Sequence, residues 1–196
     1  MDKKEKVLTF QNELKWIKDK QLRKQTIEII SELPDYFFTV PASSTGKYHP
    51  SYSLGEGGLV RHTKSAVLFA HTILELEQNQ YDYDNDEQDI IIISLLLHDG
   101  VKQGVDNSEG YTRTTHPTDM SYFVSKFIMD KYGELSWQWQ TISNCIASHM
   151  GEWNTDRSGT EILPKPETDL QKFVHMCDYL SAQRFIEIDF NKVKYN

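Results

Sequence analysis

The chain shows the spacing of amphipathic helices along most of its length. In segment 4–20, apolar residues recur every three or four positions, which predicts one helix with a single apolar stripe. These residues are Val7, Phe10, Leu14 and Ile17. Segment 23–33 predicts a second helix that ends before Pro34, because the residue preceding a proline disfavours helical geometry. We expect both helices to pack into a core.

The pattern changes in segment 34–58, where Pro, Gly and Ser are frequent and no helical period remains. This composition predicts a long irregular loop. Helical spacing returns at 59–76, and a surface loop is predicted at 154–168 from its turn residues. Further helices are predicted at 119–132, 136–149 and 169–185.

Segment 84–99 combines an acidic start with an almost entirely apolar run at 90–97. Periodicity alone allows this run to be a buried strand or a buried helix. A helix is favoured because acidic residues suit a helix N-terminus, and because no second strand candidate exists to pair with a strand here. We therefore predict an all-α fold, a helical bundle of about six to eight helices.

Length and composition fit one compact domain. The chain has 196 residues, of which 38% are hydrophobic and 26% are charged, as is ordinary for a globular protein with an adequate core. We expect a single domain over 1–196, with N-terminal helices at 1–33, the loop at 34–58 and the core at 59–196. No stretch approaches the ~20 consecutive apolar residues of a membrane span, and the N-terminus lacks the apolar segment of a signal peptide.

Cysteine content and net charge indicate the expected cellular compartment and the class of binding partner. Only Cys145 and Cys177 are present, which predicts free thiols in a reducing cytoplasm rather than a disulfide framework. The net charge of −8 argues against a broad groove for long nucleic acid, since such grooves need clustered Lys and Arg. A small anionic substrate remains compatible with this charge. No membrane partner is expected, and homo-oligomerisation is left open.

The apolar run leads directly into His98 and Asp99. Alone, this pair could be no more than the capped end of a helix. His62, His149 and Asp178, however, belong to three other predicted helices. Imidazole nitrogens and carboxylate oxygens that converge from several helices are the ligands of borderline divalent cations such as Mn, Fe, Co and Zn. The sequence therefore predicts a metal centre.

In their order along the chain, these residues resemble the motif of the HD-domain superfamily of metal-dependent phosphohydrolases. The matching positions are His62, His98, Asp99, Lys102, His116, His149 and Asp178. The stretches GEGGLVRHT, LLLHDGVK, IASHMGEW and FVHMCDYLSA are most similar to the HD domains of bacterial 3′-to-5′ exoribonucleases and related small HD proteins. The resemblance covers about residues 55–184.

The resemblance implies an HD-type helical bundle with two divalent cations of Mn, Fe, Co, Ni or Zn at its centre. The first cation would be bound by His62, His98, Asp99 and Asp178. The second would be bound by His116 and His149, with Asp99 bridging the two. Two adjacent cations can stabilise an attacking hydroxide and the charge that accumulates on a phosphoryl group.

Asp99 and Lys102 are the expected catalytic residues, with Lys102 facing the phosphate as a point charge. Gly100 is expected to let the chain turn away after Asp99. For two of these residues an interpretation without a functional role stays open. Lys102 could be a surface lysine, and His116, which precedes a proline, could be an ordinary loop histidine.

The segment SSTGKYHP at 43–50 leads toward His62 and offers further candidates for substrate binding. It lacks the spacing of a phosphate-binding P-loop. Lys47 and His49 could contact a phosphate or sugar there, or belong to a plain surface loop. Arg61 and Arg113 are weaker candidates for the same role.

Other aromatic and histidine residues are open to structural interpretations. Trp137, Trp139 and Trp153 could stack on a base, although aromatic residues on helices more often pack in the core. His71 is half a turn out of phase with His62 on the same predicted helix and should be ordinary packing. His175, three residues before Asp178, is expected to support the ligands or the core.

The favoured function is hydrolysis of a phosphoester in a nucleotide or a short oligonucleotide by a metal-activated water. The same ligand pattern also supports di-iron oxygenases that act on small polyols or phosphonates. A 3′-to-5′ exoribonuclease is a further alternative, which the acidic charge and the lack of room for a nucleic-acid-binding domain before the core disfavour. An inert HD fold used for regulation or assembly is disfavoured because all six ligands are present.

Overall fold

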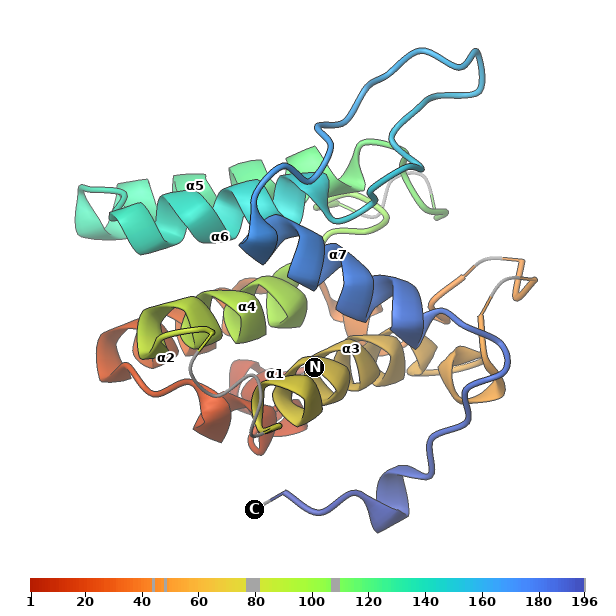
Figure 1. Ribbon diagram of the computed structural model, residues 1–196, viewed down its shortest axis with the longest axis horizontal. Helices are drawn as coiled ribbons and strands as arrows, with labels where there is room; N and C mark the ends of the chain where they lie inside the picture. The colour runs from red at the N-terminus through yellow and green to blue at the C-terminus, as the bar shows by residue number, and fades with distance from the viewer. Residues whose placement is uncertain (44, 48, 77–81, 107–109, 196) are drawn as a thin grey trace.

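The computed structural model describes residues 1–43, 45–47, 49–76, 82–106 and 110–195 (Figure 1). Within these residues the fold is all-α, with seven α-helices and no strand beyond one isolated bridge between Thr155 and Glu161. The helices are α1 (Lys3–Thr9), α2 (Lys20–Glu32), α3 (Gly58–Leu74), α4 (Asn85–Leu97), α5 (His116–Tyr132), α6 (Trp137–Ser148) and α7 (Asp169–Ser181). The predicted fold class is confirmed.

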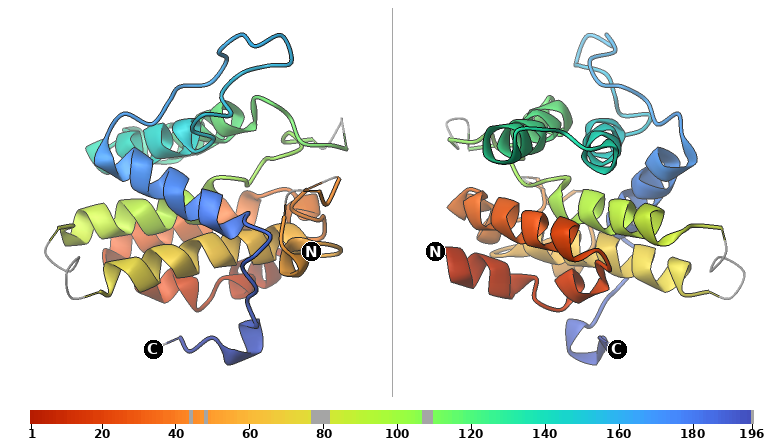
Figure 2. Two further views of the ribbon diagram at one scale, coloured as in Figure 1. Left: turned by 45° about the vertical axis from the view of Figure 1, so that its right-hand side comes forward. Right: turned by 90° about the vertical axis from the view of Figure 1, so that its left-hand side faces the viewer.

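The helices form two layers that α7 connects (Figures 1 and 2). The pair α5 and α6 forms one layer, and α1 to α4 form the other. Helix α7 packs against α3, α4 and α6, so it touches both layers. None of the helices in the described part of the chain is both long and apolar enough to cross a membrane.

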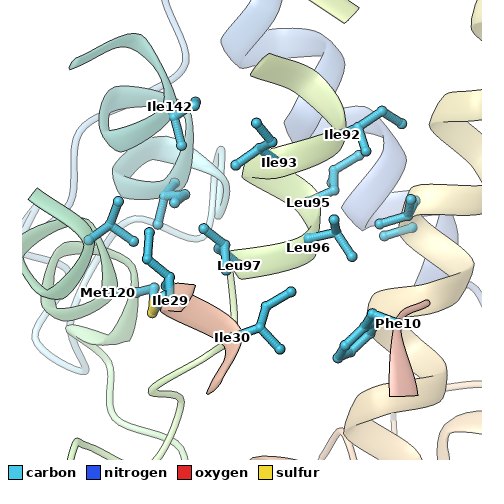
Figure 3. Packing of buried hydrophobic residues seen from close by; sticks show 14 of the residues in the cluster. Phe10, Ile29, Ile30, Ile92, Ile93, Leu95, Leu96, Leu97, Met120 and Ile142 are labelled. Atoms are coloured by element: carbon cyan, nitrogen blue, oxygen red, sulfur yellow. The ribbon is translucent and has the colours of Figure 1, made fainter. Parts of the chain in front are cut away.

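Helix α4 lies at the centre of the core. Asp84 caps its start through a capping box with Glu87, and the apolar run that follows has no polar face. A helix that is apolar all round must be surrounded by protein, and every residue of the 90–97 run is buried. Figure 3 shows the side chains of this run among residues from other segments, including Phe10, Ile29, Ile30, Met120 and Ile142. The prediction of a helix rather than a strand is confirmed.

The prediction of one N-terminal helix over 4–20 is wrong. Helix α1 ends at Thr9, and a separate 3₁₀ turn covers Glu13–Trp16. The apolar stripe nevertheless faces the core, since Phe10, Leu14 and Ile17 are buried. The break lets the buried carboxylate of Glu13 lie 2.9 Å from the Lys64 ammonium of α3. The spacing of apolar residues therefore predicted correctly which side chains are buried, but it did not predict that the helix is interrupted.

Other boundaries differ by smaller amounts. Helix α7 ends at Ser181, four positions before the predicted end at 185, where Ala182 forms the C-cap. Helix α5 begins at His116, three positions before the predicted start at 119. The irregular segment 34–58 contains two 3₁₀ turns, Asp35–Phe38 and Ser51–Ser53, and the first of them buries its three aromatic side chains.

Candidate metal centre

Helix ends bring the six predicted ligands to one place. His98 is the C-cap of α4, and Asp99 follows it. His116 is the first residue of α5, and His149 is the C-cap of α6. The start of α3 and the ends of α4 and α6 all lie toward the same side of the molecule, on the right in Figure 1. His62 of α3 and Asp178 of α7 complete the group, and Asp178 is its most exposed member, with 16% of its side chain accessible.

One half of the group, which we term the first half-centre, contains His62, His98, Asp178 and Oδ2 of Asp99. The Nε2 atoms of His62 and His98 lie 3.3 Å apart. Oδ1 of Asp178 is 3.0 Å from the former and 3.4 Å from the latter. Oδ2 of Asp99 is 3.6 Å and 3.4 Å from the same two nitrogens. Four donor atoms therefore surround one point.

The second half-centre contains His116, His149 and Oδ1 of Asp99. Its two Nε2 atoms also lie 3.3 Å apart. Oδ1 of Asp99 is 3.1 Å from Nε2 of His116 and 3.8 Å from Nε2 of His149. The single carboxylate of Asp99 thus faces both histidine pairs, one oxygen toward each.

Hydrogen bonds on the far side of each ring fix how the histidines point. Three Nδ1 atoms lie 2.7 Å from the backbone carbonyl three residues earlier, namely those of His98, His116 and His149. Nδ1 of His62 lies 2.9 Å from the Ser181 hydroxyl, which itself donates to the carbonyl of Asp178. Each Nδ1 faces an oxygen acceptor, which assigns its proton there and leaves the Nε2 lone pair directed at the centre.

With the ring protons on Nδ1 only, this arrangement places several hydrogen-bond acceptors together without matching donors. Two pairs of Nε2 lone pairs face each other, and Oδ1 of Asp99 is buried without a hydrogen-bond partner among the described residues. Unpaired polar atoms are costly in a protein interior. Atoms bound to one cation at about 2.1 Å lie about 3.0 to 3.4 Å from each other, close to the spacing found here. The donor set therefore fits a metal ion.

The electrostatics point the same way. Burial lowers the pKa of His98, but the carboxylates of Asp99 and Asp178 outweigh it and raise that pKa to about 10. Burial opposes ionisation of Asp99 as well, yet Lys102 and His98 hold the pKa of this carboxyl well below its usual range. By contrast, burial and the nearby His98 lower the pKa of His149 to about 3. The two ionised carboxylates therefore favour positive charge beside them. Lys102 and a proton on His98 can supply that charge, and a bound cation would supply it in place of the proton.

Lys102 supplies part of that charge. Its ammonium lies 2.5 Å from Oδ2 of Asp99, in a turn that follows α4. Its side chain is largely buried, so it is not a solvated surface lysine. Gly100, between the ligands and this turn, does not adopt a positive φ. The chain turns at Gly100 as expected, but a Cβ there would lie 2.7 Å from Leu33 and 2.9 Å from Met120, so close packing and not a left-handed conformation requires glycine.

The other candidate residues are only partly brought to this centre. The ring of His49 is 5.3 Å from that of His62, and its buried Nδ1 has no hydrogen-bond partner among the described residues. Lys47 is exposed nearby, and Arg184 donates to its carbonyl. Ser44 and Tyr48 of the same predicted loop lie outside the described residues. Burial lowers the pKa of His49 to about 3, so its ring is neutral.

Arg61 and Arg113 have other partners. Arg61 donates to the carbonyls of Tyr52 and Leu54, and it lines a separate cavity of about 400 Å³ that none of the six ligands lines. Arg113 pairs with Asp119 at 3.2 Å, and its carbonyl accepts from Nδ1 of His116.

The tryptophans divide into core and surface. Trp139 is buried and donates from its indole nitrogen to Gln25 at 2.7 Å. Trp137 and Trp153 are exposed.

Two further histidines lie outside the group of six. His71 stacks on Trp16, away from the centre, and Nδ1 of His175 lies within hydrogen-bonding distance of the carbonyl of His149. The packing interpretation of His71 is confirmed, and His175 supports the backbone of His149, one of the predicted ligands.

The sequence analysis missed Ser181 and Tyr36. Ser181 orients His62, and Tyr36 donates to the carbonyl of Gly104 while accepting from the amide of Gln103, just after Lys102. A serine in a helix and a tyrosine in a loop carry no distinctive spacing, so no signal in the sequence marks them.

Comparison with known proteins adds no relative: no protein-family model, curated protein or solved structure matches this chain.

Proposed function

We propose that this chain is an HD-domain phosphohydrolase that binds two divalent cations and cleaves a phosphoester of a nucleotide or a short oligonucleotide. The observation that carries the proposal is the position of Asp99, whose two oxygens face two separate histidine pairs. A carboxylate shared in this way is suited to bridging two adjacent cations. Metal-assisted phosphoryl chemistry commonly uses such a pair.

The first half-centre would hold one cation through two imidazoles and two carboxylates. The second would hold the other through His116, His149 and Asp99, which supply one donor fewer than the first half-centre does. Mixed nitrogen and oxygen donors suit Mn, Fe, Co, Ni or Zn. When bound, such cations supply Lewis acidity and lower the pKa of water.

The protein's own residues would bind and orient the substrate. Lys102 neutralises Oδ2 of Asp99. With that carboxylate balanced by bound cations, the Lys102 ammonium would be able to bind a phosphate oxygen as a point charge. His49, beside His62 and neutral, offers a ring nitrogen as a hydrogen-bond partner to a phosphate or sugar hydroxyl. The buried surroundings keep bulk water away from the reacting group and strengthen these interactions.

The test is product formation by the purified protein with added manganese. The panel contains nucleoside mono-, di- and triphosphates, cyclic nucleotides, short RNA and bis(p-nitrophenyl) phosphate. We expect turnover with a nucleotide or short oligonucleotide, abolished in Asp99→Ala. Asp130→Ala is the matched control, because Asp130 is an exposed carboxylate that pairs with Lys126 across one turn of α5, away from the centre.

The outcomes separate the alternatives. Stepwise shortening of the RNA from its 3′ end, without turnover of the nucleotides, would replace the nucleotide enzyme by an exoribonuclease. Bound iron with oxygen uptake and no phosphoester cleavage would overturn the hydrolase proposal in favour of a di-iron oxygenase. Equal turnover by wild type and Asp99→Ala would show that the activity belongs to a contaminant and would reject the proposal.

A further inference from the structure

We propose that Trp153 and Tyr179 form a stacking platform that binds the planar base of a nucleotide beside the metal centre. The inference rests on the proposed function for its phosphate-binding half and deepens it by assigning the residues that select the substrate class. The platform itself stands on a separate set of contacts.

The two rings are parallel and accessible. Their centroids are 5.6 Å apart and their planes differ by 12°. Trp153 is 51% exposed and Tyr179 is 40% exposed, so each ring keeps surface in contact with solvent. Large aromatic side chains usually bury most of their surface. An exposed pair in parallel orientation therefore offers a flat apolar face to a third ring.

The pair adjoins two metal-ligand residues. Tyr179 directly follows Asp178 on α7, and Trp153 lies four positions after His149. His175 connects the two sides, because its Nδ1 is 2.7 Å from the carbonyl of His149 and its ring centroid is 6.1 Å from that of Trp153. A base on the platform would thus lie next to the residues that would hold its phosphate.

The arrangement of α7 supports the same placement. Val174, Cys177 and Ser181 are buried and mark the core side of the helix. Asp178 lies at the edge of this side, and Tyr179 lies one residue further round toward solvent. Asp178 and Tyr179 are therefore one 100° step apart on the helix surface, and Asp178 is the most exposed of the six predicted ligands.

The platform is held in place before any ligand arrives. Gly151 has a φ of +59°, and a Cβ there would lie 2.2 Å from the His175 ring, so His175 occupies space that only glycine leaves free. The amide of Trp153 donates to the carbonyl of Met150 at 3.1 Å, which closes the turn after α6. Nε2 of His175 lies 3.2 Å from the Glu152 carboxylate. A preordered site loses less conformational entropy on binding.

A nucleobase fits this surface better than a second phosphate. The exposed carboxylate of Glu152 contacts His175, whose ring lies 6.1 Å from Trp153 and 6.4 Å from Tyr179, and its negative charge repels anions. Every base has a π face, and stacking of a base on an aromatic side chain contributes substantially to binding of single-stranded nucleic acid. The same stacking would favour a nucleoside phosphate over a sugar phosphate that lacks a base.

The first experiment measures binding of adenosine, which has a base but no phosphate. Adenosine is titrated into the protein while the indole N–H resonances are followed by NMR. We expect the Trp153 resonance to shift, and Trp153→Ala to weaken binding by about tenfold or more. Trp137→Ala is the matched control, because Trp137 is 56% exposed at the start of α6 and should leave affinity unchanged. Tyr179→Phe, which keeps the ring, should bind as wild type does.

The second experiment compares kcat/KM for a nucleoside phosphate and for ribose 5-phosphate. Trp153→Ala should lower the first about tenfold and leave the second unchanged. Adenosine binding that is equal in wild type and Trp153→Ala, or absent in both, overturns the platform. Adenosine binding that needs Trp153, with no phosphoester turnover by any variant, retains the platform and rejects the phosphohydrolase instead.

Discussion

The hydroxyl of Ser181 lies 2.9 Å from Nδ1 of His62, although 119 positions separate the two residues in the sequence. Because this hydroxyl donates its own proton to the carbonyl of Asp178, it can only accept from His62. Ser181→Ala should therefore leave a buried N–H unpaired and free the ring to turn. We expect metal affinity to fall about 10- to 100-fold, measured by competition with a chelator.

Ser148→Ala is the control for that variant. Ser148 is also buried at the end of a helix and precedes His149, but its hydroxyl donates to the carbonyl of Asn144 and contacts no ring nitrogen of the centre. Metal affinity in Ser148→Ala should stay near that of wild type. An equal loss in both variants would mean that packing, and not ring orientation, determines the effect.

The two carboxylates of the centre should differ in how many cations they control. Asp178 faces only the first histidine pair, whereas Asp99 faces both. We expect Asp178→Asn to retain about one tightly bound cation per chain and Asp99→Asn to retain none, against about two in wild type. Elemental analysis after gel filtration measures the stoichiometry. Two retained cations in Asp99→Asn would refute the bridging role.

His71 should give the folded protein a pH dependence that is unrelated to metal. Its ring stacks on Trp16 with centroids 3.9 Å apart, and burial lowers its pKa. The His71 ring therefore binds a proton more readily in the unfolded chain than in the folded chain. The free energy of unfolding is highest above about pH 6.5 and decreases as the pH falls below that value. Urea titrations at pH 7 and pH 5 should show a smaller difference for His71→Gln than for wild type. A larger difference for His71→Gln than for wild type would mean that His71 does not destabilise the folded protein at low pH.

The positions that the sequence predicted well are those that a local pattern determines. An apolar run with an acidic start had to be a central helix, and the helix had to end where His98 and Asp99 begin. The out-of-phase position of His71 followed from the 100° step of a helix. The same step explains Arg61, which adjoins His62 in the sequence but contacts the backbone of the 52–54 turn instead.

The remaining features depend on contacts between distant segments. Apolar spacing continued across the break after α1 because side chains can face the core without continuous helical hydrogen bonds. Ser181 reaches His62 only because α7 packs on α3, and no residue near either one indicates that packing. Gly100 is a packing position because Leu33 and Met120 approach it from two other segments. Such pairings appear only once the helices are arranged in space.

Tyr36 should support the turn that carries Lys102. Its buried hydroxyl donates to the carbonyl of Gly104 at 2.7 Å and accepts from the amide of Gln103 at 2.9 Å. Tyr36→Phe leaves both backbone groups unpaired in the interior, which should lower the free energy of unfolding by about 1 to 3 kcal/mol in urea titrations. Because these groups immediately follow Lys102, KM for a phosphorylated substrate should also rise.

Tyr132→Phe separates the two effects of losing a tyrosine hydroxyl. Tyr132 donates to the Glu28 carboxylate at the far end of α5, so its loss should reduce stability without changing KM. A rise in KM that is confined to Tyr36→Phe would therefore indicate that the turn positions Lys102, because general destabilisation would affect both variants. Unchanged KM in Tyr36→Phe, with the expected loss of stability, would mean that Lys102 keeps its position without this support.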